Sequence, residues 1–167
     1  GKRLALDQIV DDRAEIWVKT LDAGPVTRIF SGGSQTYRPF WSADGRSIGF
    51  VSDMDRVGAV YRAASDGSGT IELLARSPKA VDEGAWSSDG QWLVLRLGSG
   101  GGRDIYAMRI GVDSVPKPIV ATPADDYAPA LSPDGRWLAY GSNANGKDEI
   151  YVRSFPGGGG QWQISID

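Results

Sequence analysis

Short apolar segments alternate with polar turns along the whole chain, and none shows the sustained three-to-four-residue periodicity of an amphipathic helix. The last part of the chain shows the pattern most clearly, and it predicts four strands: 127–131, 136–141, 149–155 and 161–165. Between the first two of these strands, Pro133 suits the first central position of a type I turn and Gly135 suits the left-handed position after it. The chain is therefore predicted to be all-β and built from tight hairpins.

The turn sequence recurs at a constant spacing of 45 residues. Its three copies have the form Ser-x-Asp-Gly, and their aspartates are Asp44, Asp89 and Asp134. A second marker, an apolar residue followed by an aromatic one, occurs four times: Ile16-Trp17, Val60-Tyr61, Ile105-Tyr106 and Ile150-Tyr151. A repeat of this length with four strands per unit predicts a β-propeller of four-stranded antiparallel blades.

The repeat predicts a partial blade over 1–33 and complete blades over 34–78, 79–123 and 124–167, which together contain fifteen strands. Because the first six residues align with Gly45–Phe50, we expect a fragment of a larger propeller whose open ends favour self-association. Blade faces are buried against neighbouring blades, so the aromatic residues of the second strands, Trp92, Trp137 and Tyr140, are predicted to lie in the core.

With these residues in view, the repeats resemble those of the TolB-like propellers. The most specific stretches are 128–140 and 148–165. The second stretch is similar to propellers that follow bacterial serine/threonine protein kinase domains, where Ile-Tyr-Val-Arg-Pro-Phe-Pro precedes glycines and Trp-Gln-Ile-Ser; here Ser154 replaces the proline. The resemblance implies a six-bladed bacterial parent, periplasmic or at the cell surface, that binds or senses rather than catalyses.

The amino-acid composition limits the reactions and ligands that the chain can support. The chain has no cysteine and no histidine, which excludes disulfides, thiolate nucleophiles and a histidine general base. Its net charge is −3 and it has no run of basic residues, so the electrostatic footprint of a nucleic-acid-binding protein is missing. No apolar run approaches the length of a membrane span or a signal peptide.

Three patterns imitate functional motifs without meeting their requirements. The loop 141–148 is close to a phosphate-binding loop, but Asp148 stands where a hydroxyl is needed and a strand follows. The segments 53–55 and 143–146 are similar to the start of calcium loops, yet the acidic closing ligand is absent. The three turn aspartates are more simply explained as residues that cap their own hairpins. We therefore predict no catalytic residue, no metal ligand and no cofactor.

Because successive strands of a blade run in opposite directions, the loops that connect them lie alternately on the two faces of the propeller. The Ser-x-Asp-Gly turns lie on one face, here called the far face, and the loops 52–58, 97–103 and 142–148 lie on the opposite near face. The inter-blade segments 35–38, 81–83 and 125–127 join the near face and lead into the innermost strands. They supply a predicted binding rim around the central channel: Tyr37, Arg38, Asp82, Glu83, Asp126 and Tyr127.

A repeat without a catalytic set favours a non-catalytic module that binds a protein, peptide or cell-wall ligand, as the sensor or scaffold part of a larger protein such as a receptor-type serine/threonine kinase. Two alternatives remain open. The chain could be the gating propeller of a prolyl-oligopeptidase-like serine hydrolase, or part of a TolB-type periplasmic translocation protein. In each case any catalysis lies outside this chain, because no Ser-His-Asp set can form without histidine.

Overall fold

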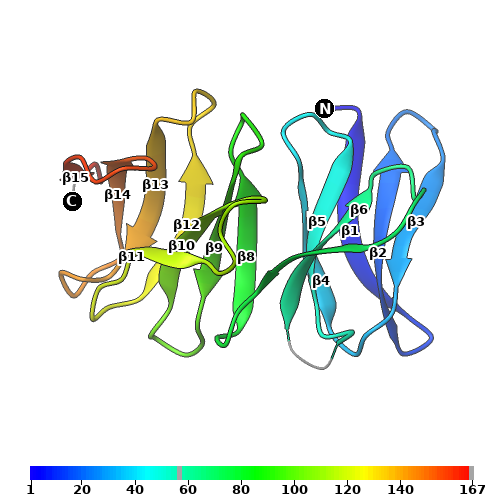
Figure 1. The fold of residues 1–167 in the computed structure, drawn as a ribbon, viewed down its shortest axis with the longest axis horizontal. Coiled ribbons are helices and arrows are strands. Elements are labelled where there is room, and N and C mark those ends of the chain that lie inside the picture. Colours follow the sequence, from blue (N-terminus) through cyan, green and yellow to red (C-terminus); the bar gives the residue numbers. More distant parts are fainter. Residues whose placement is uncertain (56–57, 166–167) are drawn as a thin grey trace.

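A computed structural model describes residues 1–55 and 58–165 of the chain. This described part contains fifteen strands in four antiparallel sheets, and no helix (Figure 1). Positions 56–57 of the predicted near-face loop and positions 166–167 of the last predicted blade lie outside the described residues.

Within each sheet the strands are hydrogen-bonded in sequence order. The first sheet has three strands: β1 (Arg3–Val10), β2 (Arg13–Thr20) and β3 (Val26–Ser31). The second has four: β4 (Thr36–Trp41), β5 (Ser47–Ser52), β6 (Ala59–Ala64) and β7 (Glu72–Arg76). The third contains β8 (Val81–Trp86), β9 (Trp92–Leu97), β10 (Asp104–Arg109) and β11 (Lys117–Val120). The fourth contains β12 (Asp126–Leu131), β13 (Trp137–Ser142), β14 (Glu149–Ser154) and β15 (Gln161–Gln163). The predicted all-β fold, with three strands and then three sets of four, is confirmed.

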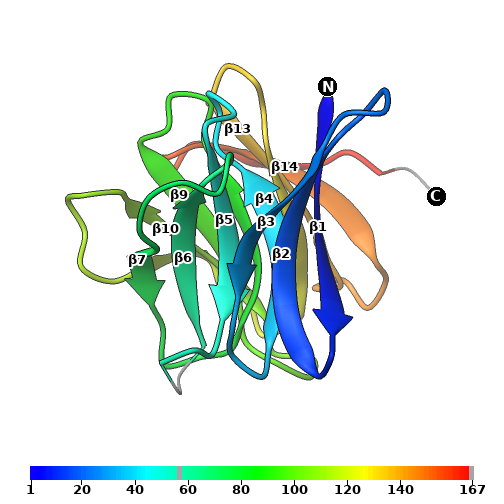
Figure 2. The same ribbon diagram turned by 90° about the vertical axis from the view of Figure 1, so that its right-hand side faces the viewer.

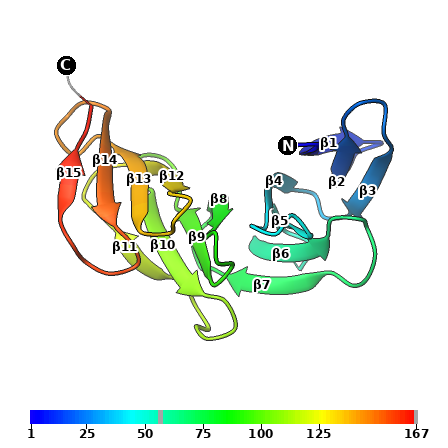
Figure 3. The ribbon, with the colours of Figure 1, turned by 90° about the horizontal axis from the view of Figure 1, so that it is seen from above.

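The four sheets follow one another along an arc. Seen from above, β4, β8 and β12 lie on its concave side, and β7, β11 and β15 lie on its outer side (Figure 3). Each sheet packs on the next through its innermost strand, with β1 on β4, β4 on β8 and β8 on β12. Figure 2 shows the first two sheets from the side, with strands running between the two loop faces. This is the arrangement of consecutive propeller blades.

The turn aspartates close their own hairpins, as predicted. Asp44 Oδ1 accepts hydrogen bonds from the Ser42 hydroxyl at 2.7 Å and from the Arg46 amide at 3.0 Å. Asp89 and Asp134 receive the same pair of bonds from the equivalent serine and amide. The glycine after each aspartate has a φ of 68° or 69°, a conformation that glycine adopts without steric cost. These turns fix the register of the first hairpin in each complete blade.

Acid should weaken the last of these turns. Hydrogen bonds from Ser132 and Arg136 lower the pKa of Asp134 from 3.8 to about 2. A carboxyl group whose pKa is lower in the folded state adds stability above its ordinary pKa and loses that contribution as the pH falls toward its folded value. We expect Asp134→Asn to reduce the loss of melting temperature between about pH 4 and about pH 2, because the amide has no charge to lose.

The measurement is thermal unfolding followed by circular dichroism across this pH range. Asp22→Asn is a matched control, because Asp22 is also an exposed turn aspartate and its carboxylate accepts no hydrogen bond from the residues that the structure describes. An unchanged acid profile for Asp134→Asn would refute the role given to this carboxylate.

Three apolar clusters form the core, one between each pair of consecutive sheets. Their largest fully buried side chains include Phe50, Tyr61, Leu93 and Leu95. Tyr140 is buried and Trp92 packs at the edge of the third cluster, as predicted. The prediction for Trp137 is wrong: it is 38% exposed, because in the described part of the chain no further sheet covers that face of the fourth one.

Candidate functional site

The innermost strand of each complete blade departs from regular pairing at its near-face end. The register with the second strand shifts between Tyr37 and Phe40, between Val81 and Glu83, and between Tyr127 and Ala130. In the first and last of these bulges a non-glycine residue takes a left-handed conformation, Arg38 with φ 56° and Ala128 with φ 50°. A bulge re-aims side chains, and strained residues of this kind concentrate at functional sites.

Two arginines and two carboxylates meet beside these bulges. Arg96 of β9 is opposite Glu83 in the β8–β9 register, and its buried guanidinium binds the Asp82 carboxylate and lies 3.2 Å from Glu83 Oε1. Arg38, from the preceding sheet, reaches the same carboxylates at 3.4 Å and 3.7 Å. The cluster therefore ties the second sheet to the third, while Arg38 stays about half exposed.

A third arginine continues the cluster toward the fourth sheet. Arg103, in the loop after β9, donates from Nε to Asp125 at 2.7 Å and forms a second bond through Nη2. These hydrogen bonds hold the pKa of Asp125 below its ordinary value and raise the pKa of Arg103. Three arginines thus pair with three carboxylates across three sheets, so this end of the innermost strands carries both positive and negative charge.

Two tyrosines frame this cluster. The Tyr37 hydroxyl donates to the Val81 carbonyl at 3.0 Å, and its pKa is raised by burial and by the negative charge of Asp82. The Tyr127 ring lies on Gly141, where a Cβ atom would come within 2.5 Å of the ring, so this position requires glycine. Burial and a hydrogen bond to Asp148 raise the pKa of Tyr127.

The structure brings together four of the six predicted rim residues: Tyr37, Arg38, Asp82 and Glu83. Tyr127 occupies the equivalent place on the next innermost strand. Asp126 does not lie on the rim. Its side chain is fully buried and accepts hydrogen bonds from the amide and hydroxyl of Thr122, because the bulge begins only after this residue. That the other five residues bind a ligand stays a prediction.

The prediction missed Arg96, Arg103 and Asp125. Arg96 carried a usable signal, because it is a charged residue in an apolar second strand whose register partner across the hairpin is acidic. Arg103 and Asp125 lie in the near-face segments 97–103 and 125–127, but nothing in the sequence indicates that they pair, because 22 positions separate them and neither repeats in the other units.

The near-face loops of the third and fourth blades lie on the same side of the molecule (Figure 1). A hollow of about 480 Å³ lies between the third and fourth blades and is lined by Gly101, Pro123, Ala124, Asn143, Ala144 and Gly146. It adjoins Asp125, whose amide donates to the Asn143 side chain at 2.9 Å. The near face therefore combines a charged rim with a hollow that is lined mainly by small residues.

The aspartates of the calcium-like segment have structural partners. Asp53 accepts a hydrogen bond from the Gln35 amide at 2.9 Å and another from Ser34, while Asp55 accepts from Tyr61 and Arg76, each at 3.0 Å. Across residues 1–55 and 58–165, no group of three acidic, histidine or cysteine residues could hold a metal ion. These loops are held by protein contacts.

The fold and the repeat define the class of this molecule: it is a β-propeller arc made of consecutive four-stranded blades. No family model matches the chain. The chain is 25% identical to the uncharacterized peptidase YuxL of Bacillus subtilis, over 81% of this chain and 26% of that protein. It is also 25% identical to a TolB homolog of Chlorobium luteolum, over 83% of this chain and 31% of that one.

Solved structures agree with this class. TolB from Acinetobacter baumannii superposes with a TM-score of 0.74 at 23% identity, over 92% of this chain and 38% of that one. An Agrobacterium tumefaciens protein assigned to TolB gives a TM-score of 0.78 at 22% identity, over 98% and 61%. The fold is that of a TolB-like β-propeller. The chain spans about a quarter to a third of the length of the two curated relatives.

Proposed function

We propose that this chain is a non-catalytic binding module of a larger bacterial protein and that its near-face rim holds a protein, peptide or cell-wall ligand. The single observation that carries the proposal is the paired-charge cluster at the bulged innermost strands. Arg38 is 52% exposed and its ion pairs are long, at 3.4 Å and 3.7 Å, so a ligand carboxylate can replace its partners at small cost. Arginine and tyrosine are also enriched where interfaces bind most strongly.

The relatives support a proposal for the location of the parent protein. Several matched proteins carry the TolB name, among them the Chlorobium luteolum homolog and the Acinetobacter baumannii structure, and they support an extracytoplasmic location and a TolB-type role in an envelope complex. The resemblance of 148–165 to kinase-linked propellers supports the sensor half of a receptor-type serine/threonine kinase. In the described part of the chain no helix is long and apolar enough to cross a membrane.

The match to YuxL supports a second candidate, the propeller of a peptidase, because that relative aligns with 81% of this chain. There the near-face rim would meet peptide substrates on their way to a separate catalytic domain. This chain contains no histidine, so the hydrolytic residues of such a protein would lie elsewhere.

The rim is tested by replacing one charged side chain with a shorter, uncharged polar one. We expect Arg38→Gln to reduce capture of a partner from a cell-envelope extract at least tenfold, because the exposed guanidinium is lost from the centre of the rim. The melting temperature should change by less than about 3 °C, since Arg38 makes only long, half-exposed ion pairs.

Arg46→Gln is the matched control. Arg46 is an exposed arginine of the far-face turn, and no hydrogen bond from its side chain is found within the described residues. Equal capture by wild type, Arg38→Gln and Arg46→Gln would contradict binding at the near-face rim.

A further inference from the structure

Equivalent residues of successive blades face one another across each sheet interface on the far face. Strand register identifies the first set: Arg3, Ser47, Trp92 and Trp137 pair with Thr20, Ala64, Arg109 and Ser154. A second set, one residue in each complete blade, is Trp41, Trp86 and Leu131, which pair with Ile48, Leu93 and Leu138. Each interface therefore brings one member of the first set toward one member of the second.

At the first interface an arginine covers a tryptophan. The Arg3 guanidinium lies 4.6 Å from the centre of the Trp41 ring. It donates to the Gly45 carbonyl at 2.6 Å and to the Ser65 hydroxyl at 2.9 Å. A guanidinium over an indole face is a favourable cation–π pair, so this interface shows how the far face accommodates an arginine side chain.

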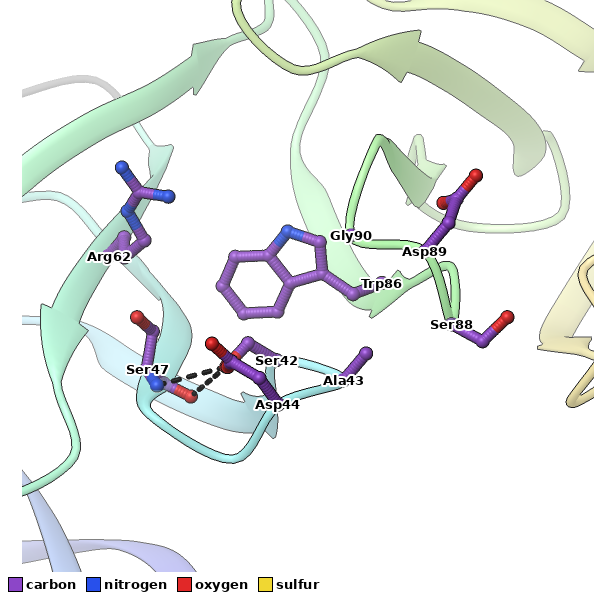
Figure 4. Close-up of a pocket in the computed structure, with 9 residues that line it drawn as sticks. All are labelled: Ser42, Ala43, Asp44, Ser47, Arg62, Trp86, Ser88, Asp89 and Gly90. Atoms are coloured by element: carbon purple, nitrogen blue, oxygen red, sulfur yellow. Dashed lines mark hydrogen bonds between the residues drawn. The ribbon is translucent and has the colours of Figure 1, made fainter.

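At the second interface the arginine is missing. Ser47 stands in its place and is too short to cover the ring of Trp86. A cavity of about 210 Å³ remains, and Figure 4 shows the indole at its centre, between Arg62 and Ser47 on one side and the 88–90 turn on the other. The ring is held from behind, 5.0 Å from Phe40 and so close to Gly49 that a Cβ there would lie 2.9 Å from it.

A hollow of about 240 Å³, lined in part by Arg3 and Trp41, also lies at the first interface, so the second interface differs from it by its uncovered indole and not by having a cavity. At the third interface Trp92 and Leu131 both pack against the third core cluster, so the residue in the tryptophan position is smaller and the residue that faces it is large. Among the three interfaces of the described chain, only the second combines a tryptophan with a small facing residue.

The second cavity has the charge and the acceptors that suit a cation. Asp44 and Asp89 both line it, and each uses only Oδ1 in its turn. Gly90 lines it too, at the repeat position of Gly45, whose carbonyl accepts from Arg3. The cation in its wall, Arg62, already donates from Nε and Nη2 to Glu72, at 3.2 Å and 2.5 Å.

We infer that the far-face cavity over Trp86 binds the guanidinium group of an arginine side chain from a partner, in the position that Arg3 occupies over Trp41. The bound group would stack on the indole, lie beside Gly90 and be attracted by the negative charge of Asp44 and Asp89 in the turns that line the cavity. This site is on the face opposite the near-face rim, so the result of its test is independent of the test of the proposed function.

The test is an NMR titration that follows the indole N–H signals of the full chain. The Trp86 signal is assigned by its loss in Trp86→Leu. Leucine is chosen because it occupies the equivalent position, 131, in the next blade. The probe is N-acetyl-L-arginine amide, and N-acetyl-L-citrulline amide is the neutral control of the same shape. We expect saturable shifts of the Trp86 signal with the arginine probe, with a Kd in the millimolar range, and at least tenfold weaker binding of the citrulline probe. Equal responses to both probes would overturn the inference.

Two substitutions that swap the equivalent residues of the first and second interfaces make the test specific. Ser47→Arg restores the arrangement of the first interface and should abolish the Trp86 response, while Arg3→Ser should uncover Trp41 and create a second responding indole. A Trp86 response that persists unchanged in a folded Ser47→Arg protein would refute the site. Because Arg3→Ser tests the same geometry at another interface, failure of its Trp41 signal to respond would also count against it.

Discussion

Phe50→Ala should lower the free energy of unfolding by about 3–5 kcal/mol, the typical cost of removing a buried phenylalanine. Phe50 is fully buried in the cluster between the first and second sheets. Its ring stacks between Phe30 and Tyr61, with centroids 5.0 Å and 6.0 Å away, and neither rigid neighbour can fill the space left behind. Urea unfolding followed by tryptophan fluorescence measures the change.

Trp162→Ala is the control for this prediction. Trp162 is also aromatic and has a ring partner, Trp137 at 5.8 Å, but it is 51% exposed on the three-residue strand β15. Its removal should cost less than the removal of Phe50, because about half of the Trp162 side chain stays in water in the folded chain and no enclosed cavity is left behind. A larger loss for Trp162→Ala than for Phe50→Ala would mean that the cluster between the first two sheets is not the main source of stability.

The second large effect is expected at the charged cluster. Arg96→Met should destabilise the fold by about 2–3 kcal/mol, because Asp82 and Glu83 lose the arginine that they share. Losing one partner of a fully buried pair costs about 3–5 kcal/mol; here both carboxylates are 28% exposed and keep Arg38, so the cost is smaller.

The control is the triple variant Arg96→Met, Asp82→Asn, Glu83→Gln, which removes the charges together. It should recover at least half of the lost stability, because no unpaired carboxylate remains. If Arg96→Met were neutral in urea unfolding, the arginine would not be a structural tie between the sheets.

The repeat made the fold predictable because the information that sets each blade is local. The Ser-x-Asp-Gly turn determines the first hairpin by side-chain bonds within five residues, and the same turn recurs every 45 residues. The arrangement of blades follows because each sheet has two apolar faces. Trp137 shows the limit of this reasoning: its strand has the apolar pattern of the buried ones, and only the absence of a covering sheet among the described residues exposes it.

The candidate site was predictable only in part, because it depends on contacts between blades. Counting within the repeat located Tyr37, Arg38, Asp82 and Glu83 at equivalent positions. Strand alternation could not show that the bulge leaves Asp126 buried, or that Arg96 turns its guanidinium toward the acidic pair. Both facts follow from register shifts, which arise from pairing between strands rather than from composition.

The packing of each sheet on its neighbour in sequence also governs how the molecule unfolds. The principal contacts between sheets join the first to the second, the second to the third and the third to the fourth. Stability in such a linear array is a sum of internal terms and nearest-neighbour interface terms, rather than the property of one indivisible core. Each of the two middle sheets contacts a neighbour on both faces, so local opening of one of them should cost the loss of two interfaces in addition to its internal terms.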